Sequence, residues 1–292
     1  MADRLSPADL AGAESVGGDC TVVIANPVAT TDGRGSADLG AVFWQTFPTV
    51  AALLGGSLLD AGAVLFHRDG LAKLGSERLT SDDPVTSAVI EIAAAGGTLK
   101  AVLIPGESDA ARPTNPPKLV PSRPPKRDRW LADVIQEISL SHLTGPTASP
   151  AEVVAIRAGL LLWHDFLDES HSFSQSIEGE GTHNTGDYWH SLMHRRELDY
   201  ENSKYWFRRV GVHPVFESLA ARGERLIGEA GSSSEKLFRK IAPGGRWDPF
   251  AFVDVCAASA ESDDTETAMF LRQIQADEML LLLWQSCQDA VD

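Results

Sequence analysis

The sequence predicts a mainly α-helical protein, with a small N-terminal α/β portion followed by a helical bundle-like C-terminal two-thirds. From residue 130 onward, apolar side chains recur at the spacing of three and four residues that is typical of amphipathic helices. Before residue 105, short runs rich in Val, Ile and Leu alternate with glycine-rich turns, a pattern that favours strands. A dense run of prolines lies between these two regions.

The sequence before residue 105 predicts two parts, residues 1–19 and residues 20–104. Residues 1–19 are rich in Ala, Gly and Ser and lack apolar periodicity, so we expect a flexible N-terminus. Residues 20–104 predict a small α/β or mixed part, with strands at 21–25 and 99–104. Helical spacing is present at 38–54 and at 84–95, and Gly96-Gly97 provides a stop for the second helix.

Residues 105–129 form a Pro-rich basic connection that contains seven of the sixteen prolines. Proline removes a backbone donor and restricts the residue before it, so regular helix or sheet is not expected here. We expect an extended connection on the surface. A mobile lid and a proline-rich ligand for a partner protein are the alternatives.

Residues 130–292 predict a helical part that carries the candidate site. The clearest helix is 151–177, where Ser149 is expected to cap, Pro150 suits the first turn and Glu152 completes a capping box. The last helix is apolar on most sides, which indicates a core position or half of a homodimer interface. The remaining helices are expected near residues 130–140, 187–198, 203–210, 215–228, 234–241, 248–260 and 264–288.

Composition excludes several classes of protein. The 292 residues are 43% hydrophobic and 23% charged, as in a globular protein. A net charge of -16 argues against nucleic-acid partners and anionic membranes, because both require basic surface. We find neither an apolar run of about 18 residues nor a signal peptide. The three cysteines form no C-x-x-C pair, so a cytoplasmic protein is the simplest expectation.

Six of the eight histidines lie between residues 164 and 213. On the predicted helix 151–177, His164, Asp168 and His171 are spaced i, i+4 and i+7, which places them within an arc of about 60°. His190, His194 and Glu197 repeat this spacing on the next predicted helix. A short glycine-rich loop joins the two helices, so we expect them to pack antiparallel with the two triads facing each other.

Imidazoles and carboxylates that converge from facing helices can hold Fe, Mn or Zn. We therefore expect a divalent metal cofactor, with Asp168 or Glu197 as a further ligand or a general base. A metal-free acid/base site and a purely structural network are the alternatives. The expected metal ligands are His164, His171, His190 and His194.

The dipeptide His164-Asp165 resembles the paired metal ligands of HD-type metal phosphohydrolases. The resemblance covers these two residues. It implies a further upstream histidine, for which His142 is available, and a downstream aspartate.

Basic and aromatic residues follow the second triad. Arginine can bind a carboxylate or phosphate in bidentate fashion, and an aromatic side chain can stack on a ring. The sequence thus predicts a metal-dependent enzyme of hydrolase or oxygenase type that acts on a small anionic or aromatic molecule. The alternative is a non-catalytic binding or scaffold protein. The expected substrate-binding residues are Arg195, Arg196, Arg209 and Trp206.

Overall fold

The computed structural model describes residues 21–29, 39–55, 63–66, 74, 84–106, 115–146, 149–229, 232–260 and 266–292. The flexible N-terminus expected at residues 1–19 lies outside these residues. The chain divides into two compact units, Met1–Thr114 with Ile138–Gly145 and Asn115–Glu137 with Pro146–Asp292. The first holds a small sheet with helices and the second is built from helices, which confirms the mainly α fold with a small N-terminal α/β portion. None of the helices in the described part of the chain combines the length and apolar character that a membrane span requires.

The sheet of the first unit has three strands in the order β2-β1-β3. The strands are β1 (Thr21–Ala29), β2 (Ala63–Phe66) and β3 (Thr98–Gly106). β1 runs antiparallel to β2 and parallel to β3, with Val23 opposite Lys100. Both predicted strands are present and longer than expected. β2 was not predicted, because a run of four residues is too short to show the alternation of apolar and polar side chains that is typical of a strand.

In the described part of this unit the helices are α2 (Leu39–Thr46), α3 (Pro48–Leu54), α5 (Pro84–Ala94) and α7 (Leu140–Leu143). The continuous helix predicted at 38–54 is wrong, because the chain breaks at Phe47, where φ is -130° and ψ is 65°. Proline disfavours the helical conformation at the preceding residue, and Pro48 then begins the next helix. The helix predicted at 84–95 is confirmed as α5, which ends before Gly96 in the left-handed region at φ +75°.

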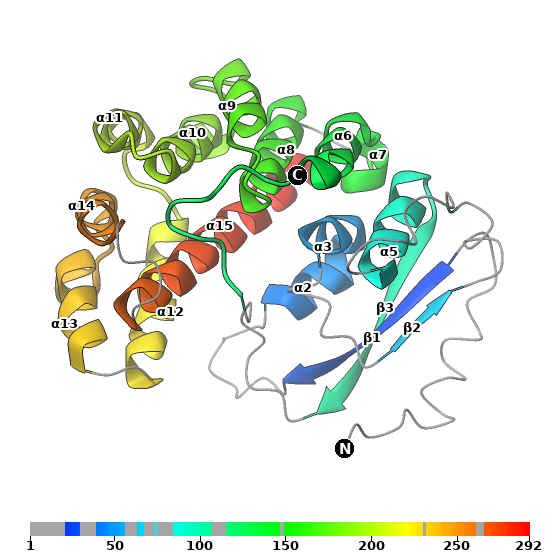
Figure 1. Cartoon of the computed structure of the whole chain (residues 1–292), viewed down its shortest axis with the longest axis horizontal. Coiled ribbons are helices and arrows are strands. Elements are labelled where there is room, and N and C mark those ends of the chain that lie inside the picture. Colours follow the sequence, from blue (N-terminus) through cyan, green and yellow to red (C-terminus); the bar gives the residue numbers. More distant parts are fainter. Residues whose placement is uncertain are drawn as a thin grey trace. The chain divides into compact units, whose positions relative to one another are not determined.

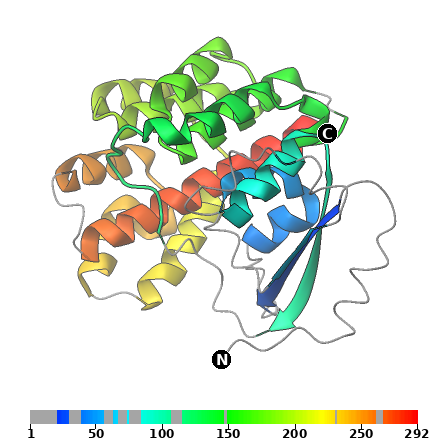
Figure 2. The ribbon, with the colours of Figure 1, turned by 45° about the vertical axis from the view of Figure 1, so that its right-hand side comes forward.

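The second unit is a set of helices around α15 (Glu266–Val291), which contacts α8, α12, α13 and α14. In both views α15 lies between the α8–α11 helices and the α12–α13 pair (Figures 1 and 2). Most of its apolar side chains are buried within this unit, so its apolar character reflects a core position. The other helices are α6 (Arg129–Glu137), α8 (Pro150–Trp163), α9 (Leu167–Ser176), α10 (Thr185–Arg196), α11 (Tyr200–Val210), α12 (Val215–Glu229), α13 (Ser232–Ile241) and α14 (Pro249–Ser259).

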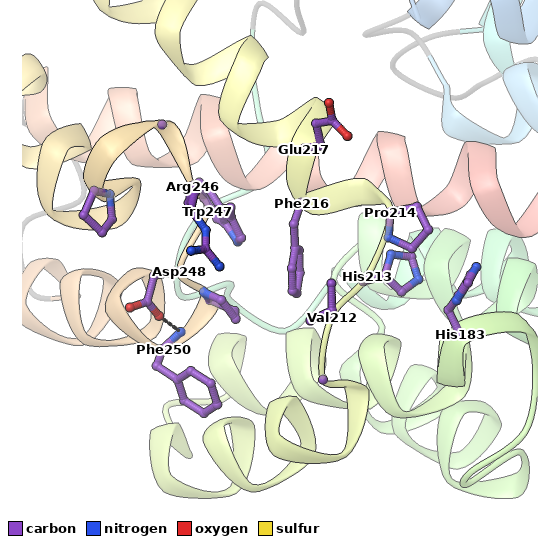
Figure 3. Close-up of a pocket in the computed structure, with 14 residues that line it drawn as sticks. His183, Val212, His213, Pro214, Phe216, Glu217, Arg246, Trp247, Asp248 and Phe250 are labelled. Carbon is purple, nitrogen blue, oxygen red and sulfur yellow. Dashed lines mark hydrogen bonds between the residues drawn. The ribbon is translucent and has the colours of Figure 1, made fainter.

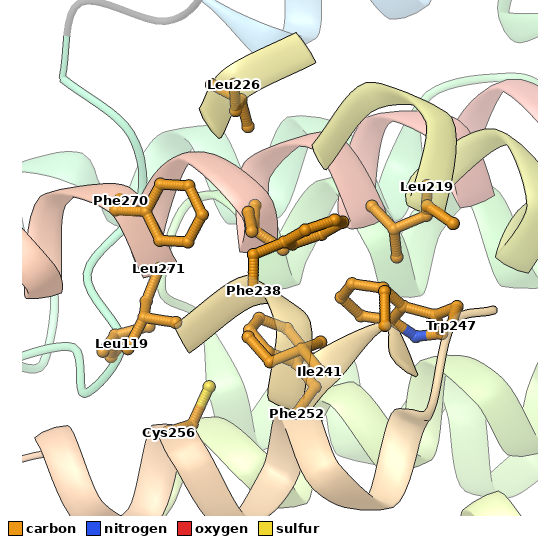
Figure 4. Packing of buried hydrophobic residues seen from close by; sticks show 13 residues of the cluster. Leu119, Leu219, Leu226, Phe238, Ile241, Trp247, Phe252, Cys256, Phe270 and Leu271 are labelled. Atoms are coloured by element: carbon orange, nitrogen blue, oxygen red, sulfur yellow. The ribbon is translucent and has the colours of Figure 1, made fainter. Parts of the chain in front are cut away.

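The apolar core at one end of α15 combines large side chains from four helices. Phe238 of α13 and Phe252 of α14 have no exposed surface and pack with Leu271 of α15 and Leu219 of α12 (Figure 4). Trp247, in the turn before α14, stacks edge-on against Phe252 at 5.0 Å between ring centroids. These contacts fix α12, α13, α14 and α15 relative to one another.

The Pro-rich segment is anchored to the second unit by arginines. Arg272 of α15 is 5% exposed and donates through Nε to the carbonyl of Pro116 at 3.1 Å. Arg196 of α10 donates through Nη2 to the carbonyl of Lys118 at 3.0 Å. Pro105 and Gly106 end strand β3, so the expectation of no regular structure is wrong for these two residues. From residue 115 the described part of the segment is irregular until a short 3-10 turn at Lys126–Asp128, as expected from its prolines. Residues 115–129 belong to the second unit.

The start of α8 differs from the expected capping box. Ser149 occupies the N-cap position and Pro150 the first turn, but the Ser149 side chain makes no capping hydrogen bond. The carboxylate of Glu152 instead accepts a hydrogen bond from the backbone N–H of Thr182, 30 residues away. Glu152 is fully buried, and burial raises its pKa to about 7. It therefore joins α8 to the loop before α10.

Candidate functional site

A sharp turn separates α8 from α9, so the single helix predicted at 151–177 is wrong. α8 ends at Trp163, His164 is its C-cap residue, and Asp165 has a left-handed φ of 67°. The buried guanidinium of Arg196 stabilises this turn: it donates to the carbonyl of Leu162 and to Oδ1 of Asp165, the latter at 2.6 Å. His164 therefore does not share a helix face with Asp168 and His171, which both lie on α9.

Three of the four predicted metal ligands come together where α9 meets α10. The ring of His171 on α9 lies 4.7 Å from that of His190 and 5.3 Å from that of His194, both on α10. The rings of His190 and His194, one helical turn apart, stack at 4.7 Å with an interplanar angle of 19°. Each of the three offers a nitrogen, and these nitrogens lie within 4.8 Å of one another. The two predicted helices thus face each other at these residues.

His190 is the most constrained member of this three-histidine cluster. Its ring is 1% exposed and stacks on Trp206 of α11 at 4.0 Å between centroids. Neither Nδ1 nor Nε2 has a hydrogen-bond partner among the described residues. Burial, with a smaller contribution from the neighbouring His194, lowers the pKa of His190 to about 3. The ring is therefore neutral, with a free lone pair and an unpartnered N–H.

His194 is oriented by its polar neighbours. Its Nδ1 lies 2.5 Å from Oε1 of Glu197, and its Nε2 lies 3.0 Å from Nδ2 of Asn202. Burial lowers the pKa of His194, whereas Glu197 acts to raise it. In the neutral ring, Nδ1–H donates to Glu197 and the lone pair of Nε2 accepts from Nδ2 of Asn202, so a metal at Nε2 would displace this amide. A carboxylate on one imidazole nitrogen that turns the other toward a metal is a recurrent arrangement in metal sites.

The donor set fits a first-row divalent ion. Two ligands at about 2.1 Å from one ion can be at most about 4.2 Å apart, so nitrogens spread over 4.8 Å need a closure of less than about 1 Å. His194, Glu197 and Asp199 form a second group within the same limit, and it shares His194 with the first. Nitrogen with carboxylate oxygen suits Zn, Fe or Mn. Neither His164 nor Asp165 belongs to either group among the described residues, and Asp165 pairs with Arg196.

A cavity of about 610 Å³ adjoins this cluster through Glu197. Asp168, at the start of α9, lines the same cavity, so the two predicted catalytic carboxylates face a common space. Part of the opposite wall comes from the Pro-rich segment, including Arg123 and Lys126. The volume is in the range of small-molecule sites.

The predicted substrate-binding residues do not line this cavity. Arg195 is 1% exposed and pairs through Nη2 with Oε2 of the fully buried Glu278 at 2.5 Å. Arg196 holds the turn after α8, as described above. Arg209 donates to Asp187 at 3.0 Å and lies over the ring of Trp206, which also stacks on His190. All four side chains are engaged in packing or ion pairs within the second unit.

Asn202 and Asp199 were missed by sequence analysis, although a local signal exists. Asp199 is the N-cap residue of α11 and accepts from the backbone N–H of Asn202 at 3.2 Å. An Asp three residues before a polar residue at a helix start is the pattern of such a cap. It places both side chains beside His194.

A second cavity, of about 770 Å³, has mainly apolar walls (Figure 3). Phe216, Trp247 and Phe250 line it, and Arg246 and Glu217 are at its edge. His213 also lines it, is 2% exposed, and accepts from the backbone N–H of Val215 at Nδ1. The residues of the three-histidine cluster do not line this cavity.

The chain matches no protein-family model, no curated protein and no solved structure.

Proposed function

We propose that the protein is a metal-dependent enzyme whose ion is held by His171, His190 and His194. The observation that carries this proposal is His190, both of whose ring nitrogens are buried without a hydrogen-bond partner in the described part of the chain. A buried polar group without a hydrogen bond is unfavourable by about 1–3 kcal/mol. A metal ion bound to one ring nitrogen of His190 would remove part of this unfavourable free energy. It would also explain why the imidazoles of His171 and His194 lie close to His190.

The surrounding residues suit an enzyme better than a structural metal site. Three protein ligands leave at least one coordination position open, as in catalytic zinc sites. The ion would supply Lewis acidity, for a hydrolase, or a dioxygen-binding position, for an oxygenase. Glu197 orients His194, and Asp168 faces the cavity where it can accept a proton from a bound molecule.

The test is the metal content and metal-dependent stability of protein purified without a metal-affinity tag. Wild type should contain close to one equivalent of Zn, Fe or Mn by elemental analysis, and His190→Leu should contain none. A ligand present at 100 times its Kd raises the free energy of unfolding by about 2.7 kcal/mol. We expect this gain for wild type and for the control His142→Gln, and no gain for His190→Leu.

His190→Leu also separates the enzyme from a scaffold. Because the ring nitrogens have no partners among the described residues, leucine removes no hydrogen bond, and the metal-free variant should be as stable as metal-free wild type. A scaffold in which this cluster fixes helix packing predicts a clear loss of stability and no metal in either protein. That pair of results contradicts the proposal.

A further inference from the structure

The proline-rich wall of the cavity beside Glu197 holds two cations that have no counterion among the described residues. Arg123 and Lys126 line this cavity, both side chains are exposed, and neither forms an ion pair within the described part of the chain. In a chain of net charge -16, two free cations at one cavity are a local exception. Pro124 and Pro125 separate them and restrict their backbone.

The charges around this cavity balance before any ion binds. Arg129 pairs with Glu169, and Asp165 pairs with Arg196 at 2.6 Å. The remaining charged groups of the lining are Arg123 and Lys126 on the segment, and Asp168 and Glu197 on the helical side. A divalent ion at the histidines changes this balance to an excess of two positive charges.

We infer that Arg123 and Lys126 form an anion-binding subsite, and that the substrate is a small molecule with a phosphate or carboxylate group. This inference rests on the proposed function, because the ion accounts for the net positive charge of the site. The anionic group contacts Arg123 and Lys126, and the reacting end lies toward Glu197 and Asp168. Guanidinium and ammonium groups are the usual partners of such anions.

Anion binding is thus assigned to Arg123 and Lys126 in place of the arginines predicted from the sequence. The arginines beside the histidines in sequence, Arg195 and Arg196, are buried in their own ion pairs. The free cations come instead from a segment about 70 residues earlier in the sequence, which the carbonyls of Pro116 and Lys118 tie to the helices. The predicted anionic substrate is kept, with a different set of binding residues.

Phenylphosphonate, a non-hydrolysable anion, tests the subsite by isothermal titration calorimetry, with Mn²⁺ present and with Mn²⁺ removed. We expect Mn²⁺-loaded wild type to bind it at least tenfold more tightly than the metal-free protein. Arg123→Gln with Lys126→Gln should weaken binding about tenfold or more and leave Mn²⁺ stoichiometry unchanged. Arg208→Gln, which removes an exposed charge from α11 outside the cavity, is the matched control and should bind as wild type does.

Equal affinity of wild type and the double variant overturns the inference, as does equal weakening by Arg208→Gln. Bound Mn²⁺ that leaves phenylphosphonate affinity unchanged also overturns it. The metal measurement keeps the two proposals distinct. A protein that takes up no metal but binds the anion through Arg123 and Lys126 contradicts the proposed function and supports the subsite.

Discussion

The ion pair between Arg195 and Glu278 predicts a large and asymmetric response to mutation. The two side chains are 1% and 0% exposed, and Nη2 lies 2.5 Å from Oε2. Arg195→Met keeps apolar contact with the ring of Phe252, over which the guanidinium lies at 4.5 Å. It leaves a buried carboxylate with the hydroxyl of Tyr188, at 3.0 Å, as its remaining donor.

Removal of one partner of a buried pair typically lowers the free energy of unfolding by about 3–5 kcal/mol. Glu278→Gln alone should fall in the same range, because Arg195 is then charged without a counterion. The double variant carries neither charge, and its glutamine oxygen still accepts from Tyr188. We therefore expect it to be more stable than Arg195→Met alone, with a coupling energy of roughly 2 kcal/mol or more.

Urea unfolding followed by far-UV circular dichroism measures each corner of this double-mutant cycle. The control is Arg239→Met, which breaks the half-exposed pair with Glu224 and should change stability by less than about 1 kcal/mol. The reasoning is refuted if Arg195→Met behaves like the control. It is equally refuted if the double variant shows the simple sum of the two single losses.

Three further predictions concern stability. Burial raises the pKa of Glu152 to about 7. The contribution of Glu152 to the free energy of unfolding is therefore fully present below its unfolded pKa of 4.5 and falls by up to about 3 kcal/mol as the pH rises toward 7. Glu152→Gln should abolish this dependence of stability on pH, measured by urea titrations at stepped pH. Burial lowers the pKa of His213 from 6.5 to about 4, so the stability present above pH 6.5 falls by a similar amount on acidification. His213→Asn keeps an acceptor for the backbone N–H of Val215 and should remove that loss. An unchanged dependence of stability on pH in this variant would contradict the role given to His213. Gly223→Ala places a Cβ 2.1 Å from the buried ring of Phe238, so it should lower the free energy of unfolding by about 1–3 kcal/mol and lower the thermal midpoint. Gly228→Ala in the same helix is the control, because its Cβ meets no atom within 4 Å, and it should be neutral or stabilising.

Local features of the site could be predicted from the sequence. The spacing of His190, His194 and Glu197 lies within one helix and the residue after it, so helical periodicity was enough to place them together. The facing of His171 toward α10 also followed, because a short loop joins the two helices. These relations depend on neighbours in the chain.

Contacts between distant residues could not be predicted. The break that removes His164 from the cluster is stabilised by Arg196, and Asp165 is 31 residues away from that arginine. Arg195 resembles a substrate clamp in sequence, but its partner Glu278 is 83 residues later. The Pro-rich segment likewise gains its place through Arg272, 156 residues from Pro116. No local pattern encodes which distant group satisfies a buried guanidinium.

The Pro-rich segment is attached to the helices through its backbone, whereas its side chains line the cavity. Arg272 and Arg196 bind main-chain carbonyls of Pro116 and Lys118, an acceptor that every amino acid provides. The side chains at the cavity, Arg123 and Lys126, are not used for this attachment. If the cavity binds the proposed anionic substrate, exchange of side chains on this segment would change its ligand preference, while the two arginines keep the path of the segment unchanged.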